Sequence, residues 1–239
     1  QGIAAETATE RVAAKIVLSE LTVGDLTENP TIPYEQDEVT RVNLDGVNKR
    51  AYEAKKNMTI GELREWVLDH KTSREELARS SCAFTGEVVA AVAKIMSSMD
   101  LVYGASTISR PTHCRTTIGL PGTLSFRCQA NSSTDDPETI LMGVMEGVSF
   151  GCGDACLGIN PVEDNVDSTR RIAEALYKFV DRNEIPTQIT VLSHITTQME
   201  AMRKGTPLSM LFQSIAGSQA ANDNFGVNRE LLEEAYALA

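Results

Sequence analysis

The fold class is decided by the stretch ACLGINPVEDNVDSTRRIAEALYKFVDRNEIPTQITVLSHI, residues 155–195. It begins with a short apolar run that ends at Asn160, continues through a helical pattern, and closes on a second apolar run that ends near His194. A strand, a helix and another strand in this order are typical of a parallel βαβ unit. The stretch therefore predicts two parallel strands joined by a right-handed crossover helix.

The same alternation extends in both directions, over residues 113–239. Further strand-like runs occupy 118–129 and 209–215, and helical patterns occupy 137–148, 196–205 and 228–239. Asp136 and Pro137 stand at the N-cap and first position of one such helix. Four βα units predict an α/β fold with about four parallel strands. A complete eight-stranded βα barrel takes about 250 residues, so the pattern fits the first half of a TIM barrel or a four-stranded doubly wound sheet.

Residues 1–112 read as a separate helical region. Helical patterns begin at Thr7 and Thr59, each with a glutamate three residues later, which is the spacing of a capping box. Residues 27–46 contain two prolines and scattered acids, and they read as a long connection. We therefore expect a helical N-terminal region over 1–112 and a truncated barrel over 113–239.

Composition limits the classes of function. Hydrophobic residues make up 42% of the 239 residues and charged residues 23%, as in ordinary globular proteins. The net charge of −11 argues against nucleic acid or an anionic membrane as partner. The chain has no apolar run long enough to span a membrane, so we expect no membrane segment. An odd number of cysteines, five, favours reduced thiols in a cytosol.

Each predicted strand ends in polar residues, which is where ligands bind in parallel βα folds. These residues are Arg127, Gln129, Asn160, His194, Gln213 and Ser214. Arg127 and Gln129 are two apart, so on a strand they point to one face and Cys128 points to the other. An arginine–glutamine pair offers several donors and an amide oxygen, which suits a hydroxyl or a carboxylate.

Other candidate sites are less favoured. His113, Cys114, Cys128, Cys152 and Cys156 lack a strong zinc spacing, so we expect no metal site and interpret the cysteines as small buried hydrophobes. Ser193 lies next to His194, but no nucleophile-elbow sequence surrounds it. The glycines of residues 147–158 precede a strand instead of opening a helix, which argues against a phosphate loop.

Several long segments, in order along the chain, resemble a known family. They are ERVAAK (10–15), GEVVAAVAKI (86–95), TTIGLPGT (116–123), GDACLGINPV (153–162), LSHITTQMEAMRKG (192–205) and FQSIAGS (212–218). Together they resemble the N-terminal half of the large subunit of ethanolamine ammonia-lyase. The resemblance runs from about residue 10 to the end, which makes it more specific than any single motif.

The resemblance implies a βα barrel with a helical N-terminal region and adenosylcobalamin over the carboxyl ends of the strands. It also implies a carbon–nitrogen lyase that deaminates ethanolamine to acetaldehyde and ammonia through a radical, with homolysis of the cobalt–carbon bond. The difficult chemistry belongs to the cofactor, and the protein orients the substrate and excludes water.

The resemblance also implies roles for individual residues. By its motifs, Arg127 and Gln129 match the pair that binds the substrate hydroxyl, and Asn160 matches an asparagine that reaches both the hydroxyl and the amine. The positions that match cofactor contacts are Pro161, Gln213, Ser214 and Phe225. The carboxylates that face the substrate ammonium in this family come from later strands, which this sequence lacks, so we expect this chain alone to be inactive.

The partners implied by the family are ethanolamine, a smaller subunit and further copies of the large subunit. The expected location is cytoplasmic, and the family often works inside a bacterial microcompartment. Two alternatives stay open. The chain could be a non-catalytic half-barrel scaffold, which the absence of acidic strand ends after Ala239 would favour. It could also be an unrelated barrel enzyme of the aldolase type, but we find no lysine at a predicted strand end.

Overall fold

The computed structural model describes residues 4–108 and 110–239, and the chain divides into two compact units. The first unit extends to residue 109 and includes residues 217–221. The second comprises residues 110–216 and 222–239.

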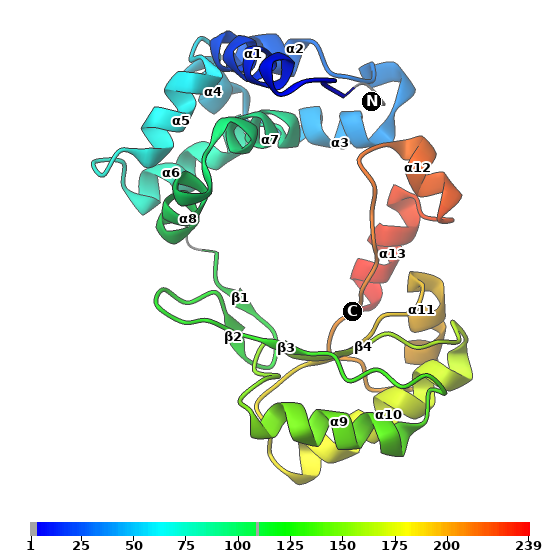
Figure 1. The fold of residues 1–239 in the computed structure, drawn as a ribbon. Helices are drawn as coiled ribbons and strands as arrows, with labels where there is room; N and C mark the ends of the chain where they lie inside the picture. The colour runs from blue at the N-terminus through cyan, green and yellow to red at the C-terminus, as the bar shows by residue number, and fades with distance from the viewer. Residues whose placement is uncertain (1–3, 109) are drawn as a thin grey trace. The chain divides into compact units, whose positions relative to one another are not determined.

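The first unit is helical (Figure 1). Its helices are α1 (Ala8–Glu20), α2 (Val23–Glu28), η1 (Tyr34–Gln36), α3 (Glu38–Asp45), α4 (Lys49–Glu53), α5 (Ile60–Leu68), α6 (Arg74–Ser80), η2 (Ser81–Ala83), α7 (Gly86–Ile95) and α8 (Ser98–Thr107). The predicted capping box at Thr59 and Glu62 is confirmed. At Thr7 only half of it forms, because the Glu10 carboxylate accepts from the Glu6 amide instead.

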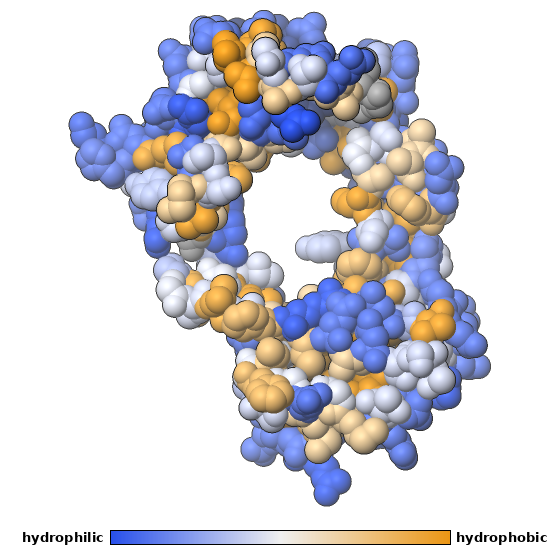
Figure 2. Space-filling view, in the orientation of Figure 1, coloured by the Kyte–Doolittle hydropathy of each residue, from blue (hydrophilic) through white to orange (hydrophobic). Residues whose placement is uncertain are grey.

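The core of the helical unit lies between α2, α5 and α7. Its buried side chains are Val23, Ile60, Leu63, Val88, Ala91 and Val92. The helical pattern predicted from Thr7 forms α1, but its apolar side chains Val12, Ile16 and Val17 stay 58–62% exposed. Figure 2 shows apolar atoms on the surface of this unit. Periodicity therefore predicted the helix, and it did not determine which face is buried.

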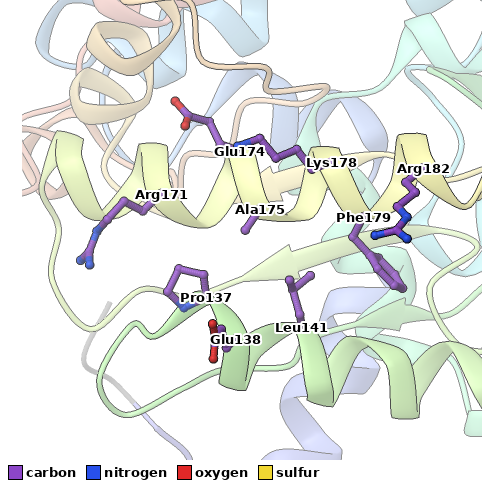
Figure 3. Close-up of a pocket in the computed structure, with 9 residues that line it drawn as sticks. All are labelled: Pro137, Glu138, Leu141, Arg171, Glu174, Ala175, Lys178, Phe179 and Arg182. Atoms are coloured by element: carbon purple, nitrogen blue, oxygen red, sulfur yellow. The ribbon is translucent and has the colours of Figure 1, made fainter.

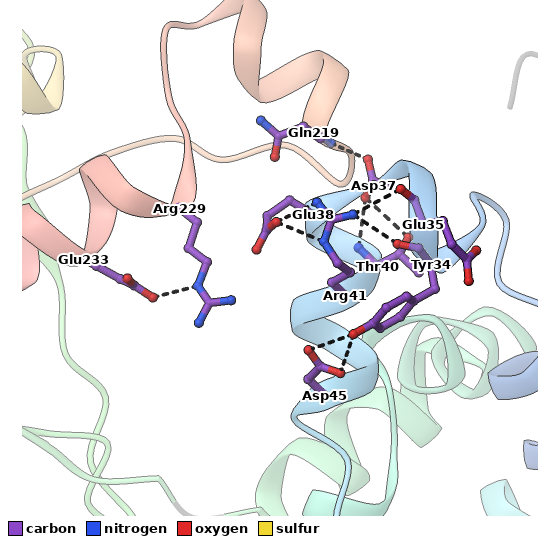
Figure 4. A network of polar contacts seen from close by, with 10 residues as sticks. All are labelled: Tyr34, Glu35, Asp37, Glu38, Thr40, Arg41, Asp45, Gln219, Arg229 and Glu233. Carbon is purple, nitrogen blue, oxygen red and sulfur yellow. Dashed lines mark hydrogen bonds and ion pairs between the residues drawn. The ribbon is translucent and has the colours of Figure 1, made fainter.

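The prediction of a long connection over residues 27–46 is wrong in part, because η1 and α3 form within it. The cause is Asp37, whose buried carboxylate accepts from the Thr40 amide (2.9 Å) and so starts α3. The same carboxylate accepts from the Gln219 amide at 2.6 Å (Figure 4). Asp37 thereby anchors the short segment 217–221 to the helices with which it groups.

The second unit combines strands and helices. Its elements are β1 (Thr112–His113), β2 (Thr117–Ile118), β3 (Arg127–Cys128), α9 (Pro137–Ser149), β4 (Cys156–Ile159), α10 (Val166–Arg182), β5 (Ile189–Val191), α11 (Ile195–Arg203) and α13 (Arg229–Leu238). The helix α12 (Gln219–Asn224) straddles the division between the units. The predicted N-cap Asp136 with Pro137 at the start of α9 is confirmed.

In the described residues, β3, β4 and β5 form a parallel sheet in that order. The pairing places Arg127 opposite Cys156 and Gly158 opposite Thr190. Helices α9 and α10 lie side by side against one face of this sheet (Figure 1). The predicted α/β class with parallel strands is confirmed to this extent.

The predicted first strand over 118–129 is wrong as a single strand. Its start belongs to β2, which pairs antiparallel with β1 in a hairpin. Between β2 and β3, Gly119 and Gly122 adopt φ of 84° and 75°, and Pro121 lacks an amide hydrogen. These residues turn the chain, so only Arg127 and Cys128 join the parallel sheet.

A fourth hydrogen-bonded strand over 209–215 does not form among the described residues. The Ser209 and Met210 amides both donate to the Ile189 carbonyl, so no regular ladder develops. The Phe212 backbone bonds to the side chain of Gln198 instead, through its amide (3.0 Å) and its carbonyl (2.6 Å). A buried side chain has thus replaced the neighbouring strand as hydrogen-bond partner.

Candidate functional site

The two faces of the parallel sheet differ in chemistry. Side chains that meet α9 and α10 are apolar and buried: Cys128, Leu157, Ile159, Ile189 and Val191. Because side chains alternate along a strand, the residues between them point to the other face. That set comprises Arg127, Gln129, Cys156, Gly158, Asn160 and Thr190, and we call this surface the polar face.

Arg127 and Asn160 meet on the polar face. The Arg127 Nη2 donates to the Asn160 Oδ1 at 3.4 Å, and both residues are exposed. Arg127 comes from the first strand of the sheet and Asn160 follows the second, so the guanidinium reaches across the adjoining strand. These two strand-end residues therefore lie within hydrogen-bond distance of each other.

Gln129 lies on the same side as Arg127. Its neighbours Cys128 and Ala130 both approach α9: a methyl group on Gly147 would lie 2.5 Å from the Cys128 Sγ, and one on Gly143 would lie 2.9 Å from the Ala130 Cβ. Since both neighbours point to the helices, Gln129 points away from them. Its side chain is exposed.

Two residues that the sequence did not single out orient Asn160 and the loop after it. The Asn131 Oδ1 accepts from the Asn160 amide at 2.9 Å. Buried Asp135 accepts from the amides of Val162 (2.8 Å) and Glu163 (2.9 Å). Pro161 lies between these contacts and is half-buried. An aspartate just before the Asp136 cap was the available signal, but one sequence does not show where its carboxylate points.

Asp135 is a charged acceptor in a buried position. Burial raises the pKa of its carboxyl, but the Glu163 and Val162 amides and the Ser168 hydroxyl together outweigh this and lower the pKa below its usual value. The carboxylate form is therefore the one that stabilises the loop.

The other predicted residues cluster around the start of α11. The Gln213 Oε1 accepts from the Ile195 amide at 2.8 Å, and its Nε2 donates to the Ser214 carbonyl at 3.0 Å. The His194 Nε2 lies 2.8 Å from the Phe225 carbonyl oxygen. Among the described residues, no hydrogen bond links Gln213 or Phe225 to Arg127. The structure thus gives two groups: one on the polar face and one beside α11.

We call the surface formed by Gln213, Ser214, Ile215 and Phe225 near the start of α11 the rim beside α11. It combines polar and apolar side chains. Phe225 is 54% exposed, and Ser214 and Ile215, which follow Gln213 in the chain, are also exposed. The His194 amide donates to the Asp164 carboxylate at 2.7 Å, which ties this rim to the loop after β4. An exposed aromatic residue and an exposed hydroxyl residue near the start of α11 suit a large ligand with a planar ring and polar substituents.

The cysteines of the sheet, Cys128 and Cys156, carry protonated thiols. Burial raises the pKa of the Cys156 thiol, and the nearby charge of Arg127 lowers it in part. Burial also raises the pKa of Cys128. Both thiols therefore stay protonated at neutral pH, as expected of small buried hydrophobes. Within residues 4–108 and 110–239, no cluster of three His, Cys, Asp or Glu side chains is placed to bind a metal ion.

A groove of 490 Å³ lies elsewhere, between α9 and α10 (Figure 3). It is lined by Pro137, Glu138, Leu141, Arg171, Glu174, Ala175, Lys178, Phe179 and Arg182. This groove is on the helical side of the sheet, whereas Arg127 is on the polar face. None of the described helices is long and apolar enough to cross a membrane.

Comparison with known proteins decides the family. The sequence profile described as "Ethanolamine ammonia lyase large subunit (EutB)" matches residues 1–239. The chain belongs to the ethanolamine ammonia-lyase large-subunit family. Two curated ethanolamine ammonia-lyase large subunits, from Escherichia coli K12 and Salmonella typhimurium LT2, are each 49% identical to it over 237 residues. Each match covers 99% of this chain and 52% of the relative, so the chain spans about half the length of these large subunits.

Proposed function

We propose that the polar face binds ethanolamine as part of an adenosylcobalamin-dependent lyase that forms acetaldehyde and ammonia. The observation that carries this proposal is the contact between Arg127 and Asn160, two strand-end polar residues on the face that the helices leave free. Membership of the ethanolamine ammonia-lyase large-subunit family supports it.

The proposed contacts follow from the chemistry of the substrate. Ethanolamine carries one hydroxyl and one ammonium. The Arg127 guanidinium donates hydrogen bonds and repels the ammonium, so it selects the hydroxyl end. The amide groups of Gln129 and Asn160 offer both donors and acceptors, so they serve the hydroxyl and, through their oxygens, the ammonium. We propose that acidic residues outside this sequence neutralise the ammonium, so that this chain alone does not turn over.

The rim beside α11 would hold the cofactor. Pro161, Gln213, Ser214 and Phe225 are its proposed contacts, and the exposed Phe225 ring and Ser214 fit a large ring system with polar substituents. When bound, adenosylcobalamin supplies hydrogen-atom abstraction through homolysis of its cobalt–carbon bond. The residues of this chain would orient the small substrate and exclude water from it.

The remaining expectations belong to the same proposal. The parallel βαβ arrangement with outer helices supports the first half of a TIM barrel over 113–239, after a helical region over 1–112. The relatives are named as large subunits, which supports a smaller partner subunit. A homo-oligomer, located in the cytoplasm or in a bacterial microcompartment within it, completes the proposal.

Substitution of Arg127 tests this function. In the full-length protein with its partner subunit, Arg127→Ala and Arg127→Lys should each lower kcat/KM for ethanolamine by about 100-fold, because a misplaced small substrate loses rate steeply. Added guanidinium should partly restore Arg127→Ala. The thermal unfolding temperature should change little, since the side chain is exposed.

Arg182→Ala is the matched control, because Arg182 is an exposed arginine on the helical side of the sheet. It should keep full activity. If Arg127→Ala matches Arg182→Ala in kcat/KM, the proposed substrate site is wrong. If Arg127→Ala prevents folding, Arg127 has a structural role instead.

A further inference from the structure

Gly158 lies directly beneath the guanidinium of Arg127. A methyl group on Gly158 would lie 2.5 Å from the Arg127 Nε, 3.0 Å from its Cζ and 3.2 Å from its Nη2. Separations under 3.0 Å are not tolerated between a side-chain carbon and its neighbours. The guanidinium therefore occupies the space that any other residue at position 158 would fill.

The backbone does not explain this glycine. Gly158 lies inside β4 and is not among the glycines with positive φ, so its conformation is open to any residue. A glycine within a strand weakens it, and its presence there often marks the close approach of another group. Here the approaching group is the side chain of Arg127.

Small residues around Gly158 leave a passage for the Arg127 side chain across β4. Arg127 starts opposite Cys156, and its guanidinium ends over Gly158, opposite Thr190 on β5. All three of these neighbours are small. The Thr190 hydroxyl is buried and has no hydrogen-bond partner among the described residues. The passage ends at Asn160, which accepts the guanidinium hydrogen bond.

We propose that Gly158 is a positioning residue: it provides the seat in which the Arg127 guanidinium lies at the height and angle needed to meet the substrate hydroxyl. The seat itself follows from the geometry above, and its effect on catalysis rests on the proposed function. Arginine has a long side chain with high conformational entropy. Because the strand surface already confines it, ordering this side chain costs less entropy when substrate binds.

The effect of a methyl group can be estimated. Moving the Arg127 Nε from 2.5 Å to ordinary contact at 3.4 Å requires a shift of about 0.9 Å. A misplacement of about 1 Å lowers the rate on the order of 100-fold. Because the guanidinium is the exposed end of a flexible side chain, it can move without unfolding the sheet. Gly158→Ala should therefore alter catalysis more than stability.

The experiment compares four full-length proteins with the partner subunit: wild type, Gly158→Ala, Arg127→Ala and the double variant. Gly158→Ala should lower kcat/KM for ethanolamine by 10-fold to about 100-fold, while its thermal unfolding temperature stays near that of wild type. The double variant should be no worse than Arg127→Ala, because Gly158 acts through Arg127. A crystal structure of Gly158→Ala should show the guanidinium displaced.

Gly147→Ala is the matched control. Its methyl group would lie 2.5 Å from the Cys128 Sγ, which is buried against α9 and cannot move aside. This variant should lose stability and keep the kcat/KM of its folded fraction. Comparing the two variants separates a loss of stability caused by crowding in the core from a loss of activity caused by displacement of Arg127.

Three outcomes decide the matter. Wild-type kcat/KM in Gly158→Ala, or effects that add to those of Arg127→Ala, would overturn the positioning role. An unmoved guanidinium in the Gly158→Ala crystal structure would overturn the seat itself. If Arg127→Ala is fully active, the proposed substrate site fails, whereas the crystal structure still decides whether Gly158 seats Arg127.

Discussion

Asp135 shows how one buried side chain holds together the loops beside the candidate site. Its Oδ1 accepts from the Val162 amide, and its Oδ2 accepts from the Glu163 amide and the Ser168 hydroxyl. It thereby joins the loop after β3 to the loop after β4 and the first turn of α10. Its φ of 52° is unusual for a residue other than glycine, and aspartate and asparagine tolerate it best.

Asp135→Asn should destabilise the protein by about 1–3 kcal/mol. Asparagine accepts the backbone conformation, but its amide nitrogen must face one of the donors that the second carboxylate oxygen now satisfies. Chemical denaturation at pH 7 measures the loss. Asp181→Asn, at the exposed far end of α10, is the control and should change stability little. An Asp135→Asn protein as stable as wild type would mean that water satisfies these donors equally well.

The same substitution carries a pH signature. The folded pKa of Asp135 is lowered, so its stabilising contribution is present above the unfolded value of about 3.9 and is lost as pH falls through the folded pKa. The stability difference between wild type and Asp135→Asn should be constant from pH 7 to about pH 5, and it should shrink below about pH 4. A difference that grows on acidification would show that the sign of this linkage is wrong.

At the scale of elements, Gln198 on α11 replaces a strand. Its Nε2 donates to the carbonyls of Ser193 and Phe212, and its Oε1 accepts from the Phe212 amide. The side chain is fully buried. It thus fixes the segment that leads to the proposed cofactor residues Gln213 and Ser214.

Gln198→Leu keeps the size of the side chain and removes all three bonds. We expect the free energy of unfolding to fall by about 3 kcal/mol or more, because the backbone groups of Ser193 and Phe212 lose their hydrogen-bond partner. Equilibrium unfolding measures it, with Glu200→Leu on the exposed side of the same helix as control. Equal stabilities for the two variants would contradict the view that Gln198 substitutes for a strand.

Elements differ in how far the sequence predicts them. The helices α9 and α10 and the N-cap of α9 were predictable, because Asp136 with Pro137 and a long amphipathic pattern are local signals. The strands at either side were not, because Gly119 and Gly122 turn the chain before β3 and Gln198 binds the backbone of Phe212. Both depend on conformations and contacts that apolar runs do not record.

The candidate site, too, was predictable from the sequence only in part. The shared direction of Arg127 and Gln129 follows from strand alternation, and the meeting of Arg127 with Asn160 follows from parallel neighbours. The place of Gly158 beneath the guanidinium required the register, which one sequence does not contain. The contacts of Asp135 required the folded loops.

Within the second unit, we propose the polar face of the sheet as the place where ethanolamine binds. Its support is the arrangement of a helix-covered apolar face opposite a face with Arg127, Gln129 and Asn160. Its main rival within the second unit is the charged groove between α9 and α10. Both locations can be distinguished in one structure.

The most direct measurement is a crystal structure of the full-length protein with its partner subunit, a cobalamin and ethanolamine. We expect the substrate oxygen within about 3 Å of the Arg127 guanidinium and the Asn160 amide, with Gln129 on the same side and the cobalamin against Phe225 and Ser214. Ethanolamine bound in the α9–α10 groove, or a bound substrate that leaves Arg127 and Asn160 untouched, would contradict this expectation.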